Sequence, residues 1–99
     1  MQLAALALLL ALSLPSSAED RAIKSRVAPL YPEIAKRMRI EGVVTMSVTV
    51  DAEGKVTDVK TVSGNRTLSI AAEDAVRKWR FAPGAGVATL EVSLNFALQ

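Results

Sequence analysis

The amino-acid sequence predicts an α+β domain, a two-layer sandwich in which two helices cover one face of a three-stranded antiparallel or mixed sheet. Two observations lead to this class. Apolar residues alternate with polar ones, the period of a half-buried strand, over residues 44–50 and again over residues 89–98. Between these stretches, residues 68–79 carry apolar side chains at the spacing that one face of a helix requires. The expected order of elements is helix, strand, strand, helix, strand.

The first helix is expected at residues 32–39. It begins at a proline, whose missing N–H would be unpaired at a helix start in any case. Ile34, Ala35 and Met38 share one side of this helix, so we expect them to face the core. We expect Gly42 to end the helix and the first strand to follow it.

A β-hairpin is expected over residues 42–62, with polar turn residues around Gly54. The first arm alternates without a break. The second arm loses its alternation at residues 57–58, which we interpret as a β-bulge. A single hairpin is marginally stable in water, so its apolar face requires a cover.

A turn cluster at residues 63–67 precedes the second helix, and Thr67 is its expected N-cap. Trp79 is the largest side chain on the apolar stripe of this helix and is expected in the core. The final strand can join the sheet beside either arm of the hairpin. We favour the first arm, reached by one right-handed crossover, which gives the sheet order second arm, first arm, last strand.

Residues 1–18 have the features of a cleavable signal peptide: an apolar run, a proline that breaks it, and a small-residue cleavage site ending at Ala18. We therefore expect export and a mature chain that starts at Glu19. The alternative is a true start further upstream, in which case the apolar run belongs to a longer membrane anchor. Residues 19–26 have mixed charges and no periodicity, so we expect a flexible lead-in.

Composition excludes several classes of function. The chain of 99 residues contains no His and no Cys, which removes the commonest general base, the commonest metal ligands and the thiol nucleophile. No nucleophile can be paired with a base, so we expect neither an enzyme nor a cofactor. The net charge of +2 is too small to indicate a partner by itself. The simplest interpretation of the basic residues at the helix ends is that they are exposed to solvent. The alternative is a patch for anionic lipid, cell-wall polymer or nucleic acid, and export argues against nucleic acid as a partner.

Several short motifs occur together along the mature chain: a Tyr-Pro pair, a Glu-Gly-Val entry to the hairpin, a glycine in its turn, and Trp-Arg-Phe-Ala-Pro at the end of the second helix. The residues that define this pattern are Tyr31, Pro32, Gly42, Gly54, Trp79, Phe81 and Pro83. In this order and spacing they resemble the TonB C-terminal domain family. The resemblance covers residues 27–98, and we assign residues 27–99 to the domain.

The resemblance implies a periplasmic, protein-binding module of an energy transducer. Such a module binds TonB-dependent outer-membrane receptors by taking a short receptor segment, the TonB box, as an added strand along its last strand. The residues themselves also favour this edge, because the second arm carries Lys55, Asp58 and Lys60 whereas the last strand carries a single charge. The expected contact residues are Thr89, Leu90, Glu91, Val92, Ser93, Leu94, Asn95 and Phe96.

Full members of the family also carry a membrane helix that engages the ExbB–ExbD motor, and a proline-rich spacer. Neither is visible in this sequence, so we expect contact with ExbB–ExbD to be indirect or absent. Anchoring in the inner membrane would require the upstream start. The alternative function is an envelope adaptor or structural module of the same fold without a receptor partner, and self-association as a homodimer is compatible with either function.

Overall fold

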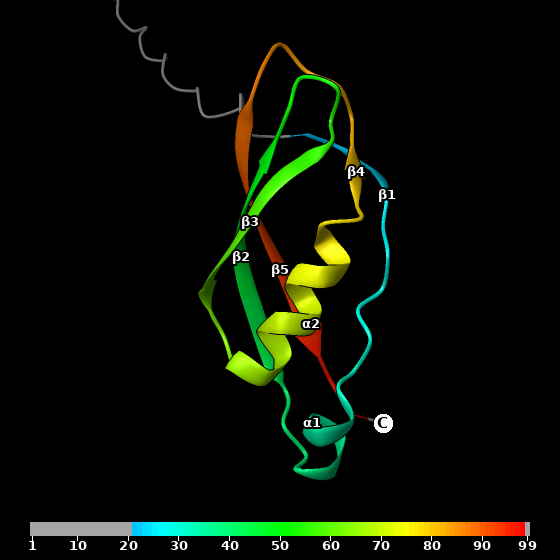
Figure 1. The fold of residues 1–99 in the computed structure, drawn as a ribbon, viewed down its shortest axis with the longest axis vertical. Coiled ribbons are helices and arrows are strands. Elements are labelled where there is room, and N and C mark those ends of the chain that lie inside the picture. Colours follow the sequence, from blue (N-terminus) through cyan, green and yellow to red (C-terminus); the bar gives the residue numbers. More distant parts are fainter. Residues whose placement is uncertain (1–20, 99) are drawn as a thin grey trace, which may run out of the picture.

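The computed structural model describes residues 21–98, which form two helices and five strands arranged in two antiparallel sheets (Figure 1). The α+β class and the predicted order of the main elements are confirmed. In chain order the elements are β1 (Ile23–Ser25), α1 (Glu33–Arg37), β2 (Gly42–Val50), β3 (Val56–Ser63), α2 (Arg66–Val76), β4 (Arg80–Phe81) and β5 (Ala88–Phe96).

The larger sheet has the order β3-β2-β5, so the last strand pairs with the first arm of the hairpin, as predicted. All nine residues of β2 pair with β5 without a register shift. The pairing of β2 with β3 is less regular, because it skips one residue at Thr57 and another at Val62. The first of these shifts confirms the bulge predicted at residues 57–58, whereas the second was not predicted.

The core lies between α2 and one face of the larger sheet (Figure 1). α1 lies at one end of the sheet, so the covering layer consists mainly of α2. Ile34 and Met38, predicted to face the core, are 56% and 65% exposed. This prediction was wrong because α1 is only five residues long and brings a single side chain, Ala35, into the core. The fully buried residues of the sheet and helix are Val44, Met46, Val48, Val50, Leu68, Ala72 and Val76.

The start and end of α2 differ from the prediction. The N-cap is Asn65, whose Oδ1 accepts a hydrogen bond from the backbone N–H of Thr67 at 2.7 Å, so the predicted cap at Thr67 was wrong. Asparagine is a favoured N-cap, because its side-chain oxygen satisfies an otherwise unpaired N–H. The helix ends at Val76, and Trp79 follows it. Trp79 is nevertheless 3% exposed, which confirms its prediction as a core residue.

The smaller sheet was not predicted. β1 pairs with β4 antiparallel, with Ile23 opposite Phe81. β1 lies within residues 19–26, so part of the segment expected to be a flexible lead-in has regular structure. These strands contain only three and two residues, which is too short for a periodicity to appear in the sequence.

Neither helix in the part of the chain that the structure describes has the length and apolar content needed to cross a bilayer. The expected signal peptide and its cleavage site after Ala18 lie outside the described residues.

Candidate functional site

β5 forms one edge of the larger sheet. On one side it pairs with β2, and within residues 21–98 no strand pairs with its other side. All eight residues predicted to contact a partner lie on this strand, which ends at Phe96 rather than at residue 98 as predicted. The site is therefore a continuous strand edge.

Two hydrogen bonds near the hairpin turn establish which peptide groups of β5 face outward. The carbonyl of Thr49 accepts from Thr57 Oγ1 at 3.3 Å, and the N–H of Asp51 donates to the carbonyl of Lys55 at 2.9 Å. Odd-numbered residues of β2 thus direct their peptide groups toward β3. Peptide groups alternate in direction along a strand, so even-numbered residues direct theirs toward β5. Each even residue of β2 lies opposite an even residue of β5, which leaves four residues of β5 with outward peptide groups: Thr89, Glu91, Ser93 and Asn95.

The two faces of this edge differ in character. The four residues with outward peptide groups also place their side chains on the face of the sheet that α2 leaves uncovered, where all four are exposed. Ser93 Oγ lies 3.0 Å from Thr45 Oγ1, a hydroxyl hydrogen bond that joins β5 to β2. On the helix side, Leu90 and Val92 are buried and Leu94 is half-buried. A strand added here would meet polar side chains on one face and apolar ones on the other.

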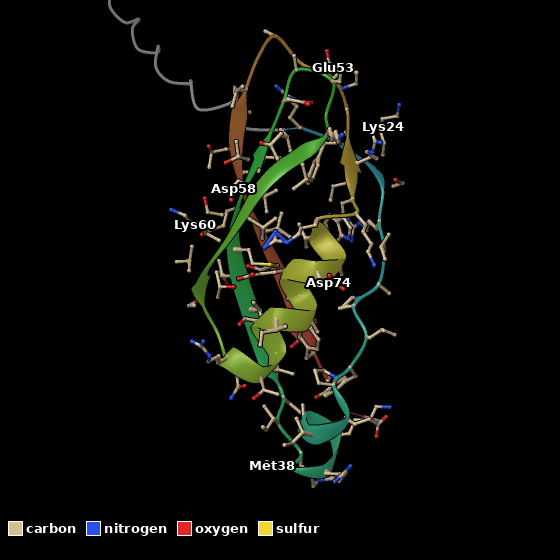
Figure 2. The ribbon with its side chains drawn as sticks, viewed as in Figure 1. Lys24, Met38, Glu53, Asp58, Lys60 and Asp74 are labelled. Atoms are coloured by element: carbon tan, nitrogen blue, oxygen red, sulfur yellow. The ribbon has the colours of Figure 1, made fainter. Side chains whose placement is uncertain are left out.

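The opposite edge, β3, is less suited to receive a strand. Its two bulges interrupt the regular spacing of peptide groups that a straight added strand needs. Figure 2 shows Asp58 and Lys60 projecting from this strand, where their charges would have to be accommodated beside any added chain. β5 is therefore the more regular of the two outer strands, and its role as the receiving edge stays a prediction.

Tyr31 supports the end of β5, and Pro32 follows it at the start of α1. The Tyr31 ring packs edge-to-face against Phe96, with 5.5 Å between ring centroids, and its hydroxyl donates to the carbonyl of Ile40. Desolvation, and to a lesser extent the charge of Glu41, raises the pKa of Tyr31 above its usual value, so the hydroxyl remains protonated. Pro32 is the N-cap of α1. Tyr31 itself is half-buried.

Trp79 and Phe81 connect the N-terminal segment to the core. The indole Nε1 of Trp79 donates to the carbonyl of Val27 at 2.8 Å, and the guanidinium carbon of Arg26 lies 5.4 Å from the indole ring centroid. Phe81 packs beside the indole, with 6.2 Å between ring centroids. This arrangement holds residues 26–27 against the end of α2.

Gly54 does more than form the hairpin turn, which is the role predicted for it from the sequence. Its φ is +90°, and a Cβ at this position would lie 1.9 Å from the carbonyl oxygen of Phe81. The N–H of Phe81 donates to the carbonyl of Gly54 at 2.9 Å, so the hairpin turn packs directly on β4. Arg21 extends this contact by donating to the carbonyls of Asp51 and Gly86. This contact was not predicted because β4 itself was not predicted.

The two remaining motif residues are backbone features. Gly42 begins β2 with a φ of +143°, where a side chain would be strained. Pro83 is exposed in the loop that follows β4. The motif residues therefore shape the fold around β5. Two of the seven meet that strand at Phe96: the Tyr31 ring packs on the Phe96 ring, and Gly42 pairs with Phe96 in the sheet.

The family model described as Gram-negative bacterial TonB protein C-terminal matches residues 27–98 of this chain. The chain belongs to the TonB C-terminal domain family. Protein TonB of Xanthomonas campestris pv. campestris (strain B100) is 40% identical over 87 residues, which cover 81% of this chain and 39% of that protein. Protein TonB of Escherichia coli (strain K12) is 33% identical over 77 residues, which cover 76% of this chain and 32% of that protein.

This TonB C-terminal domain chain thus spans about two fifths or less of the length of these curated relatives. The solution NMR structure of the Pseudomonas aeruginosa TonB CTD has the same fold, with a TM-score of 0.65 and 24% sequence identity. The superposition covers 81% of this chain and 88% of the other.

Proposed function

We propose that this TonB C-terminal domain binds TonB-dependent outer-membrane receptors by accepting a short receptor segment as an additional strand along β5, and thereby takes part in energy-coupled transport. Family membership supports the class of partner. The observation that carries the mode of binding is the row of outward peptide groups on β5, a bulge-free strand whose outer side pairs with no strand within residues 21–98. The function is one of binding, and it assigns no catalytic residue and no cofactor.

Strand addition at this edge provides affinity through the main chain. Each backbone hydrogen bond contributes on the order of 1 kcal/mol net, and four residues of β5 offer both a donor and an acceptor. Ordering an extended peptide opposes this gain, so the expected complex is of moderate affinity with modest dependence on peptide sequence. Substitutions that preserve the backbone, such as Ser93→Ala, should therefore be tolerated.

The proposal is tested by titrating the ¹⁵N-labelled domain with synthetic peptides from the N-termini of candidate receptors. The expected result is a set of amide shifts concentrated in Ala88–Phe96. Shifts confined to Val56–Ser63 would show that β3 is the receiving edge. No binding of any receptor peptide would favour an envelope adaptor of the same fold.

We also propose that the domain acts in the periplasm. With cleavage after Ala18, contact with the ExbB–ExbD motor would have to pass through another, anchored protein. The intact mass of the protein purified from its native envelope tests this point, and the expected mature N-terminus is Glu19. A product that retains Met1, or a longer one in the membrane fraction, would contradict it.

A further inference from the structure

Glu91 is the only charged side chain on β5. It lies opposite Ser47 of β2, and Lys60 of β3 lies opposite Ser47 on the other side. These residues form a row across the uncovered face of the sheet. Neighbouring strands are about 4.8 Å apart, so Lys60 and Glu91 are separated by roughly 10 Å at their backbones. Among residues 21–98, no ion pair includes Glu91.

A strand added beside β5 would continue this row by one position. Its residue directly opposite Glu91 would place its Cβ about 4.5–5.5 Å from the Glu91 Cβ, on the same solvent-facing side of the sheet. On the other side of the sheet, the added strand would lie beside Val92 and Leu94, which are apolar. An added strand would therefore lie beside a negative charge on one face of the sheet and beside apolar side chains on the other face.

We propose that Glu91 selects the incoming segment by charge. The preferred ligand is an extended peptide with apolar side chains at alternate positions and Lys or Arg opposite Glu91, whereas Asp or Glu at that position is disfavoured. This inference rests on the proposed function, because it requires strand addition at β5. It makes Glu91 a specificity-determining residue on an edge whose other contacts are largely main-chain.

The size of the effect follows from cross-strand pairs of charges on exposed sheet faces. An opposite charge directly across strengthens pairing by about 1.4-fold to 5-fold, and a like charge weakens it by a similar factor. Peptides bearing Lys and Glu at this position should thus differ in affinity by about 2-fold to 25-fold. The site is exposed, so the difference should shrink at high ionic strength.

The test uses three peptides that share alternating valines and carry Lys, Gln or Glu at every intervening position. Every register that keeps the valines on the apolar face then places the same residue opposite Glu91. The expected order of affinity for the natural domain is Lys, then Gln, then Glu. Glu91→Gln should bring the three affinities together, and Glu91→Lys should reverse the order. Glu53→Lys is the matched control, because Glu53 is exposed at the hairpin turn and the change in net charge is the same (Figure 2).

The outcomes separate this inference from the proposed function. Equal affinity of the three peptides for the natural domain, with shifts along β5, would overturn charge selection by Glu91 and leave strand addition intact. Reversal of the order by Glu53→Lys as well as by Glu91→Lys would also overturn it, since overall charge would then suffice. Failure of all three peptides and of the receptor peptides to bind would refute the proposed function itself.

Discussion

The Ser93→Pro substitution removes one N–H from the outer side of β5, which pairs with no other strand in the described part of the chain. In the free domain this N–H forms no bond within the sheet, and proline is tolerated at such edge positions. The residue before a proline is restricted to extended conformations, which Val92 already has. The remaining costs are the hydroxyl bond to Thr45 and the shift of φ from the strand value toward the roughly −65° that proline requires, so we expect a loss of stability of about 1–2 kcal/mol.

The effect on binding should be at least as large as the effect on folding. The incoming strand loses one backbone hydrogen bond, and its own carbonyl is left facing the proline ring without a partner. Together these losses amount to about 2 kcal/mol, or roughly 30-fold in affinity for a receptor peptide. Ser93→Ala is the matched control: it also lacks the hydroxyl but keeps the N–H, and it should bind as the natural domain does.

Leu94→Pro supplies the opposite control one residue away. The peptide group of Leu94 is directed toward β2, so proline there removes a bond inside the sheet as well as a half-buried side chain. Urea unfolding followed by fluorescence of the single tryptophan should show a loss of about 3 kcal/mol or more. Equal destabilisation by Ser93→Pro and Leu94→Pro would refute the assigned direction of the peptide groups. Undiminished peptide binding by folded Ser93→Pro would refute β5 as the receiving edge.

Three further predictions concern the residues that shape the fold. Trp79→Ala should cost about 3–5 kcal/mol in urea unfolding monitored by circular dichroism, and a loss under about 1 kcal/mol would contradict its role in the core. Gly54→Ala should cost at least about 2 kcal/mol, since it combines a positive φ with a backbone clash, whereas Gly86→Ala meets nothing within 4 Å and should be nearly neutral. The folded state raises the pKa of Tyr31, so its contribution to stability is complete below pH 10 and is lost as the pH rises through the folded-state pKa. The free energy of unfolding should therefore decrease above pH 10 in the natural domain, and Tyr31→Phe should abolish this decrease. An unchanged decrease in the variant would refute the raised pKa of Tyr31 as its cause.

The parts of the fold that the sequence predicted are those with a long, uniform pattern. The alternation covers residues 44–50 in β2 and all nine residues of β5, and one right-handed crossover was enough to place β5 beside β2. The bulge at Thr57 was visible because it shifts the parity of the valines on either side. The candidate edge followed from the same patterns, since the number of charges on each outer strand can be read directly.

The parts that could not be predicted depend on contacts between distant short segments. β1 and β4 have too few residues for a pattern, and each forms only because the other is held beside it. The clash that makes Gly54 necessary involves the carbonyl of Phe81, which is distant in sequence. The exposure of Ile34 and Met38 depends on how far α1 extends past the sheet, which helical periodicity does not determine.

Residue-specific amide hydrogen exchange on β5, with and without a receptor peptide, tests strand addition most directly. In the free domain, amides directed toward β2 should be protected, whereas the outward amides of Glu91, Ser93 and Asn95 should exchange rapidly. Saturating peptide should slow those three outward amides by at least about tenfold, the factor that 1.4 kcal/mol of local stabilisation produces. Outward amides that stay unprotected in the complex, while amides of β3 become protected, would contradict the account.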